Sequence, residues 1–219
     1  ERPQGPRAGS KTWQAIVIGL FRAIVLPMSL LLILIEACNR ITSGILIGLA
    51  PMVTIQELGW TQITYANWIA ITGVTAAVLG VLCSPWIDRV GALRILKWVV
   101  MFRIGLLGLT AALEPYWGIH QVFESFLMMN AVATQLVTVT LIALFMRLCS
   151  PRVAASQFAV YMALANMTYS LGSGLMVPLS HWTHQAGIML VCAALIALMW
   201  LLIHWVDFER HDQDLNRLS

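Results

Sequence analysis

A carboxylate and a guanidinium lie four residues apart inside a long apolar run: Glu36 and Arg40, with Asn39 between them. Side chains at i and i+4 share one face of a helix, and an acid N-terminal to a base is the better order for a pair. Glu36 lies about nine residues beyond Pro27, roughly 14 Å along a helix axis. If the apolar run spans a bilayer, this depth is near the middle of the membrane. Ionisable groups at that depth are costly. The pair is therefore either a structural ion pair that neutralises itself or a pair that binds a solute or carries a proton.

Other polar residues interrupt the apolar runs further along the chain. Arg103 lies about one and a half turns beyond Lys97, and we expect its long side chain to snorkel back to the headgroup region. Glu124 lies near one end of its run, where it would face water. Deeper polar groups either hold helices together or line a cavity. The deeper candidates are Asn130, Gln135, Tyr161, Asn166 and Tyr169.

The composition shows what kind of element must carry these residues. Of the 219 residues, 59 % are apolar and 11 % are charged, against about 45–50 % and about 25 % in ordinary soluble domains. The mean hydropathy of +0.81 agrees. A soluble fold of this size could not bury so much apolar surface, which excludes soluble enzymes, nucleic-acid binders and secreted disulfide scaffolds. The net charge of +3 indicates no nucleic-acid partner, because the basic residues lie at the ends of the apolar runs.

Six windows are long enough to cross a bilayer core about 30 Å thick, which takes about 20 mostly apolar residues. The runs are continuous, whereas the strands of membrane barrels alternate over about 10 residues. The sequence therefore predicts an all-α membrane protein with a bundle of six transmembrane helices over 27–206. The windows are roughly 27–53, 64–87, 93–113, 120–146, 155–179 and 186–206.

Three flanking segments have a different character. Residues 1–12 are polar and rich in Pro and Gly, which predicts a cytoplasmic linker. Residues 13–26 are apolar but interrupted by Gln14 and Arg22, which favours a helix lying along the headgroups over a separate span. Residues 207–219 are polar and are expected to form a cytoplasmic tail.

The basic residues predict the orientation of the bundle. They lie before the first span, between the second and third, between the fourth and fifth, and after the sixth, while the loops around 54–62, 114–119 and 180–185 contain no Lys or Arg. By the positive-inside rule both termini and the basic loops are cytoplasmic, in agreement with an even number of spans. The residues that set this pattern are Arg2, Arg7, Lys11, Arg22, Arg89, Arg94, Lys97, Arg147, Arg152, Arg210 and Arg217.

Motifs of intramembrane enzymes and metal sites are missing from the sequence. A serine protease of this kind would need G-x-S-G, which Gly172-Ser173-Gly174 does not supply, and neither two intramembrane Asp residues nor HExxH is present. His181 and His184 form HxxH in an outside loop, but no third ligand is near. The four Cys residues form no CxxC pair, and none lies in an outside loop. We therefore expect no enzyme activity, metal or cofactor.

Small residues at a spacing of four predict close contacts between helices. Such residues occur in three of the apolar runs. They are Gly44 with Gly48, Gly73 with Ala77, and the face formed by Ala155, Ala159 and Ala163.

The loop between the second and third spans contains the most specific local motif, Asp88-Arg89 followed by Gly91 and Arg94. It resembles the cytoplasmic D-R-x-G-x-x-R loop of major facilitator transporters. Gly91 would allow a tight turn. The three charges would latch helix ends in one transport state and release them in the other. The alternative is a basic anchor with a polar turn.

A further resemblance is distinctive at residues 144–159, where Leu-Phe-Met-Arg-Leu-Cys-Ser-Pro-Arg is followed from residue 155 by Ala-Ser-Gln-Phe-Ala. Together with Glu124-Ser125-Phe126 upstream and the loop at 57–61, this run is similar to the AmpG-type muropeptide permeases of the peptide–acetyl-CoA branch of the facilitators. The resemblance covers most of residues 13–206. In that family the chain looks like the second six-span half of a 6+6 bundle.

The resemblance implies proton-driven import of anhydromuropeptides from periplasm to cytoplasm, through the inner membrane. It also implies the partners: an amphipathic small-molecule solute, protons, the lipid bilayer and a second six-span half. Because the first residue is Glu1 and six spans form one wall of a site, we expect that half to be fused upstream or supplied by another copy. No nucleic acid and no cofactor is implied.

The same resemblance implies site residues. Arg40 lies where the family has a basic residue in the first span of this half, Glu124 matches an acidic position, and Gln157 matches a polar one that opens the next span. The chain departs from the family after Arg40, where Ile41-Thr42-Ser43 replaces Gly-Asp, and after Glu124, where Met128-Met129-Asn130 replaces glycines. These departures leave open a siderophore or acetyl-CoA-like solute, or a membrane scaffold or signal transducer that transports nothing.

Overall fold

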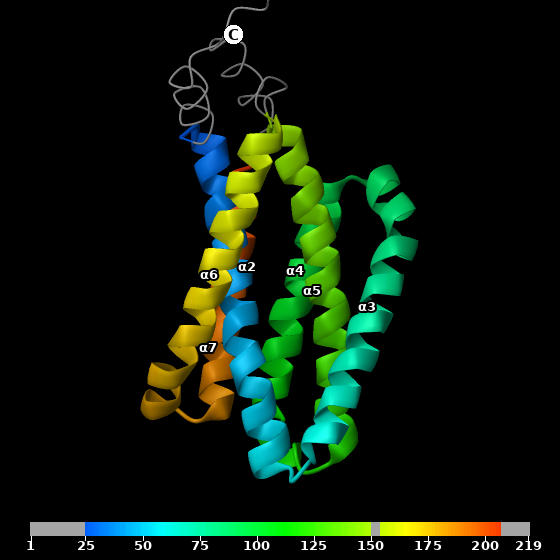
Figure 1. Cartoon of the computed structure of the whole chain (residues 1–219), viewed down its shortest axis with the longest axis vertical. Coiled ribbons are helices and arrows are strands. Elements are labelled where there is room, and N and C mark those ends of the chain that lie inside the picture. The colour runs from blue at the N-terminus through cyan, green and yellow to red at the C-terminus, as the bar shows by residue number, and fades with distance from the viewer. Residues whose placement is uncertain (1–24, 150–153, 207–219) are drawn as a thin grey trace, which may run out of the picture.

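The computed structural model describes residues 25–149 and 154–206. The linker expected over 1–12, nearly all of the interfacial helix expected over 13–26, and the tail expected over 207–219 lie outside these ranges. Within them, the long elements are six α-helices, labelled in Figure 1. They are α2 (Pro27–Pro51), α3 (Gln62–Val90), α4 (Ala92–Ala112), α5 (His120–Leu148), α6 (Ala154–Trp182) and α7 (Gln185–Ile203).

The six helices confirm the all-α prediction, and each overlaps one of the expected windows, with ends that differ from the window by at most three residues. In the part of the chain that the structure describes, five elements are long and apolar enough to cross a membrane: α2 together with the π-helix that follows it (Pro27–Glu57), α3, α4, α5 and α7. The remaining helix, α6, is as long as α3 and α5 but is less apolar, because polar residues such as Asn166, Ser170 and Ser173 lie along it. In Figure 1, α6 lies beside α2 as part of the bundle.

Local sequence sets the ends of several helices. Pro27 occupies the first turn of α2, where its missing N–H is not needed. Pro51 ends α2, and the chain continues as a π-helix (Met52–Glu57). Thr61 caps α3 by accepting a hydrogen bond from the Thr64 N–H at 3.1 Å. A short 3₁₀ turn (Glu114–Tyr116) separates α4 from α5.

The core lies where α2, α4, α5 and α7 meet. α2 packs against α6 on one side and against α7 behind, α4 packs between α7 and α5, and α3 packs mainly against α5 at the far side of the bundle (Figure 1). Large apolar side chains fill the centre. Examples with no more than 1 % exposure are Leu32, Ile35, Leu49, Leu96, Leu107, Phe123, Leu141, Ile188 and Ile196.

Two glycines bring the backbones of α2 and α6 into contact. A Cβ built on Gly44 would overlap the carbonyl oxygen of Tyr169, and one built on Gly172 would overlap the carbonyl oxygen of Ile41. A Cβ on Gly48 would lie 2.8 Å from Cγ of Met176. The contact predicted from Gly44 and Gly48 is therefore confirmed: Gly172 of α6 lies opposite Gly44, and Met176 lies opposite Gly48.

The other two small-residue predictions are wrong within the described chain. A Cβ on Gly73 would meet nothing within 4 Å, and Ala77 is exposed. The stripe of Ala155, Ala159 and Ala163 is also exposed. The reason is helical periodicity: α6 turns its other face to α2, and small residues away from that face have no helix opposite them.

Candidate functional site

An ion pair lies within α2 on the face that looks into the bundle. Nε of Arg40 donates to Oε1 of Glu36 at 2.5 Å, and Nδ2 of Asn39 donates to Oε2 of the same carboxylate at 3.3 Å. Glu36 is 3 % exposed and Asn39 is 1 % exposed. The pairing predicted from the i, i+4 spacing is confirmed, and Asn39 adds a second donor to the carboxylate.

Arg103 of α4 joins this pair through three hydrogen bonds. Its Nη1 donates to Oδ1 of Asn39 at 2.6 Å, its Nε to Oδ1 of Asn130 at 3.3 Å, and its Nη2 to Oγ of Ser43 at 3.4 Å. The amide of Asn39 thus lies between the two charged groups: its oxygen accepts from Arg103, and its nitrogen donates to Glu36. The network connects α2, α4 and α5.

The expectation that Arg103 snorkels to the headgroups is wrong. Its side chain is 0 % exposed. Arg103 lies on the same face of α4 as Val100 and Leu107, three residues before it and four after it, and both are fully buried. That face points into the bundle, where the acceptors on α2 and α5 satisfy the guanidinium.

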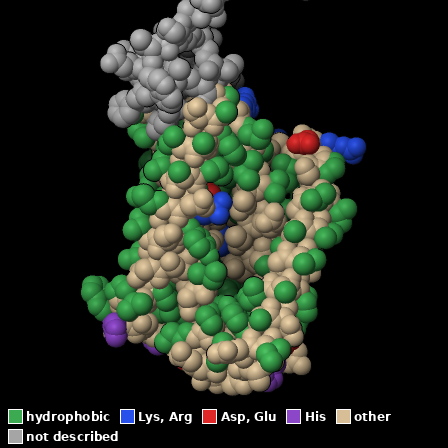
Figure 2. Space-filling model, viewed as in Figure 1, with side chains coloured by type: hydrophobic (Ala, Val, Ile, Leu, Met, Phe, Trp, Pro, Cys, Tyr) green, Lys and Arg blue, Asp and Glu red, His purple; other side chains and the backbone are tan. Residues whose placement is uncertain are grey.

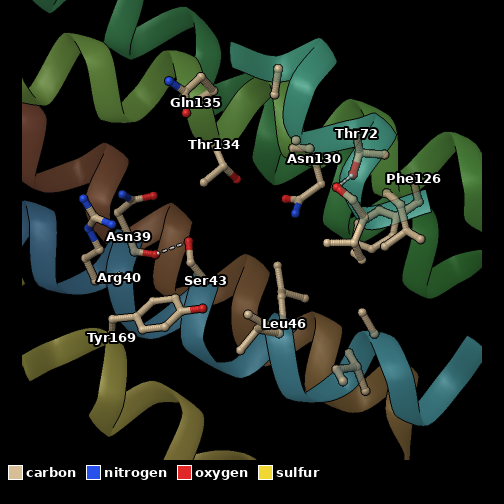
Figure 3. Close-up of a pocket in the computed structure, with 18 of the residues that line it drawn as sticks. Asn39, Arg40, Ser43, Leu46, Thr72, Phe126, Asn130, Thr134, Gln135 and Tyr169 are labelled. Atoms are coloured by element: carbon tan, nitrogen blue, oxygen red, sulfur yellow. Dashed lines mark hydrogen bonds between the residues drawn. The ribbon is translucent and has the colours of Figure 1, made fainter. Parts of the chain in front are cut away.

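A cavity of about 330 Å³ borders the network, with walls mainly from α2, α3 and α5. Figure 2 shows it as a recess at mid-height of the molecule, with basic atoms in blue and acidic atoms in red visible inside. In the close-up of Figure 3, Asn39, Arg40 and Ser43 on α2 face Asn130, Thr134 and Gln135 on α5, with Tyr169 of α6 beside Arg40. The polar residues that line the cavity are Asn39, Arg40, Ser43, Tyr65, Thr72, Asn130, Thr134, Gln135 and Tyr169.

The cavity wall combines a cation, amides and hydroxyls with a larger apolar area. Its apolar residues include Leu46, Ile69 and Phe126. Thr134 also has a buried hydroxyl oxygen with no hydrogen-bond partner among the described residues. This arrangement is suited to binding an amphipathic solute by contact and hydrogen bonding.

Seven residues are predicted to bind the solute or carry the proton: Glu36, Asn39, Arg40, Glu124, Asn130, Gln157 and Asn166. Three of them lie away from the network. Glu124 is half-buried near the start of α5 and is not among the residues that line the cavity; along the axis it is roughly 9 Å before Asn130. Asn166 is exposed on α6. Gln157 is fully buried, and its Nε2 donates to the hydroxyl of Tyr161 at 2.6 Å.

Tyr161 carries that contact on to α2, because its hydroxyl donates to Oγ of Ser29 at 3.1 Å. Gln157 therefore serves a polar junction between α6 and the first turns of α2, away from the cavity. The four predicted residues that the structure does bring together are Glu36, Asn39, Arg40 and Asn130.

The structure adds Arg103, Ser43 and Thr72 to the candidates. Ser43 could have been found, because it lies four residues after Asn39 and three after Arg40 and so shares their face. Arg103 could have been found by treating any ionisable group inside a span as functional. Thr72 gives no such signal, since nothing in its own helix distinguishes it from the other threonines of α3.

The predicted tight turn at Gly91 is confirmed. Gly91 alone connects α3 to α4, with φ of +99°, and its N–H donates to the Ile87 carbonyl at 2.9 Å. Asp88, Arg89 and Arg94 are exposed around it. In the conformation described here, over residues 25–149 and 154–206, none of the three takes part in an ion pair, so the latch remains a prediction.

Replacing Gly91 with alanine is expected to destabilise the folded protein by about 1–3 kcal/mol, because a positive φ strains a residue that has a Cβ. Gly105→Ala is the matched control, since a Cβ there would meet nothing within 4 Å and Gly105 has no positive φ. The measurement is the unfolding temperature of both variants in the same detergent. Equal unfolding temperatures would show that the turn tolerates a side chain.

At the opposite end of the bundle, polar residues join the loops. Nε1 of Trp60 donates to Nδ1 of His120 at 2.8 Å, Gln185 donates to Glu57, and His184 lies 3.6 Å from the carboxylate of Glu114. Within the described part of the chain, no group of three His, Cys, Asp or Glu side chains is arranged to hold a metal ion.

Comparison with known proteins adds one finding. A family model described as the Major Facilitator Superfamily matches residues 32–217, which include all but the first turn of the helical bundle. No curated protein and no solved structure matches the chain at a significant level.

Proposed function

The chain belongs to the major facilitator superfamily, and from this premise we propose that it is one six-helix half of a proton-coupled importer of amphipathic solutes related to cell-wall muropeptides. The family supports the general activity, which is transport of a small solute across a membrane. The choice of a muropeptide as the solute rests on the sequence similarity at residues 144–159, and the choice of proton coupling rests on Glu36. The import direction, the inner membrane and the cytoplasmic termini are parts of the same proposal.

The observation that carries the proposal is the cavity beside the charged network. Charged groups inside a span are retained where they serve a solute or ion pathway, and here they border a space of about 330 Å³. In facilitator-type transporters the site lies near mid-membrane between two halves. The recess in Figure 2 is open on one face, as the wall of a shared site would be.

A second six-span half is part of this proposal. α3 and α6 each have few buried residues in the part of the chain that the structure describes. The two helices lie on either side of the open recess in Figures 1 and 2. A partner half that packs on these helices would close the cavity, and rocking of one half against the other would expose it to each side in turn.

Proton coupling is assigned to Glu36 in preference to Glu124. Glu36 forms an ion pair with Arg40 and receives a hydrogen bond from Asn39, so gain of a proton would weaken both contacts and bias the helix packing. Glu124 lies outside the network. The charges of Asp88, Arg89 and Arg94 would then latch the cytoplasmic helix ends in one of the two states.

Glu36→Gln is expected to abolish gradient-driven accumulation of labelled anhydromuropeptide in proteoliposomes that contain the complete gene product, while solute exchange without a gradient persists. The physical reason is that glutamine keeps the shape and the hydrogen-bonding oxygen but cannot gain or lose a proton. Glu124→Gln is the matched control and is expected to accumulate solute as the wild type does.

Full gradient-driven accumulation by both variants would reject a carboxylate proton carrier at these two positions. Absence of any uptake by well-folded wild-type protein would reject this solute. A siderophore, an acetyl-CoA-like solute or a non-transporting role would then be tested next.

A further inference from the structure

The polar network carries more positive than negative charge. Its ionisable members are Glu36, Arg40 and Arg103, so with the carboxyl group ionised one positive charge is left without a counter-charge among the described residues of the network. Arg103 is satisfied by the neutral oxygens of Asn39, Asn130 and Ser43. These partners complete its hydrogen bonds but do not balance its charge. An uncompensated charge in a low-dielectric interior favours an anion nearby.

The two guanidinium groups differ in what they can offer to such an anion. Arg103 is fully buried and uses Nε, Nη1 and Nη2 on the protein itself. The side chain of Arg40 is 23 % exposed and lines the cavity. In the described part of the chain only its Nε has a partner, Glu36. A guanidinium has five N–H donors, so the two Nη groups of Arg40 remain for a ligand.

The surroundings of Arg40 provide the rest of an anion site. Asn39 and Ser43 lie on the same face of α2, and Tyr169 reaches the same wall from α6 (Figure 3). The Ser43 hydroxyl already donates to the Asn39 carbonyl at 2.9 Å, and the Asn39 amide donates to Glu36. The Tyr169 hydroxyl is therefore the neutral donor that this wall offers to an oxygen of an anion. The planar fork of an arginine binds carboxylate and phosphate in a bidentate way. Leu46 and Phe126 give the apolar contact for the remainder of the molecule.

We infer that the cavity takes the anionic group, carboxylate or phosphate, of an amphipathic ligand, with Arg40 as the residue that contacts the anion and Arg103 as a positioning residue. Arg103 acts through Asn39, whose amide it holds in place, and supplies the excess positive charge. This inference rests on the proposed transport function and specifies the charge of its solute. It assigns Arg40 as a solute contact beyond its pairing with Glu36.

The test compares ligands that differ in the charge of the head group. The probes are naphthoate, naphthyl phosphate and the neutral naphthamide, whose apolar bodies are the same. Binding to the purified complete protein in nanodiscs of phosphatidylcholine is measured from the ligand-dependent rise of the unfolding temperature. The two anions are expected to bind at least about tenfold more tightly than the amide, since one charge-assisted bidentate contact is worth that much or more. Equal binding of all three probes by the wild type would overturn the inference, whether or not any variant folds.

Variants identify the residue. Arg40→Gln is expected to lose the preference for the anions, whereas Arg40→Lys keeps the charge without the fork and is expected to retain part of it. Lys97→Gln, which removes a basic charge from the second turn of α4 outside the cavity lining, is the control and is expected to bind as the wild type does. An anion preference that survives in Arg40→Gln would overturn the assignment of Arg40.

Two further arms separate the sources of the anion and the failure of the transport proposal. Nanodiscs that contain phosphatidylglycerol test a lipid phosphate: weaker naphthoate binding in these discs, through Arg40, would identify the headgroup as the occupant of the same anion site. Uptake of anhydromuropeptide tests the solute separately. Uptake without any anion preference would support the transport function and overturn this inference. Anion binding without uptake would support this inference and overturn the proposed transport of muropeptides.

Discussion

Asn39→Leu is expected to destabilise the folded protein by about 3 kcal/mol or more, although leucine is close to asparagine in size. The amide of Asn39 accepts from Arg103 at 2.6 Å and donates to Glu36 at 3.3 Å, and all three side chains are buried. Leucine would leave the fully buried guanidinium without its shortest hydrogen bond and would also remove the Asn39 donor to the Glu36 carboxylate. A buried group left without its partner costs about 1–3 kcal/mol, and more when the group is charged.

Asn39→Asp is the informative companion to this variant. The carboxylate would keep an acceptor for Arg103 and would also cancel the excess positive charge of the network. Its second oxygen would, however, replace the Nδ2 donor that lies 3.3 Å from Oε2 of Glu36, so two carboxylates would face each other. We expect a smaller loss of stability than in Asn39→Leu, together with loss of the preference for naphthoate over naphthamide. The measurements are unfolding temperature and probe binding on the same preparations. An Asn39→Leu protein as stable as the wild type would show that the Asn39 hydrogen bonds do not hold the three helices together.

Gly172→Ala is expected to separate α2 from α6 and to destabilise the bundle by about 3 kcal/mol, at the upper end for overpacked sites. The added Cβ would overlap the carbonyl oxygen of Ile41 and lie 2.8 Å from its Cα. These are backbone atoms, so no side-chain rotation can relieve the overlap. Gly44→Ala is expected to act in the same way, through the backbone of Tyr169 and Ser173.

The matched control lies on the same helix. A Cβ on Gly174 would meet nothing within 4 Å, so Gly174→Ala is expected to leave stability unchanged or slightly raised, because alanine favours the helix. The comparison is made by unfolding temperature in one detergent and by the yield of folded protein. If Gly172→Ala and Gly174→Ala behaved alike, the close contact between α2 and α6 would not contribute to the fold.

Features that depend on neighbours in the chain were predictable. The long apolar runs predicted the helices because each span must satisfy its own backbone inside a bilayer. The pair of Glu36 and Arg40 followed from the geometry of one helix turn, and the turn at Gly91 followed from a residue type that tolerates a positive φ. The contact at Gly44 was predictable only in part, since the sequence showed the small residue on α2 but not that Gly172 of α6 lies opposite it.

Features that depend on which helix faces which were not predictable. Arg103 was expected at the headgroups, and only the packing of α4 between α5 and α7 turned its side chain toward Asn39 and Asn130. Asn166 was a candidate of equal standing with Asn130, yet one is exposed and the other borders the cavity. A polar residue on a helix has no preferred partner until the rotation of that helix is fixed.

The sequence by itself therefore determined the membrane class, the helices and the local ion pair, because these arise from hydropathy and from contacts within a few residues. Only the tertiary structure decided that Arg40 opens onto a cavity, that Arg103 adds an excess positive charge behind it, and that Thr72 and Asn130 complete the wall. The physical reason is that helix rotation and pairing are set by the summed packing of the whole bundle. A cavity exists only where that packing leaves space.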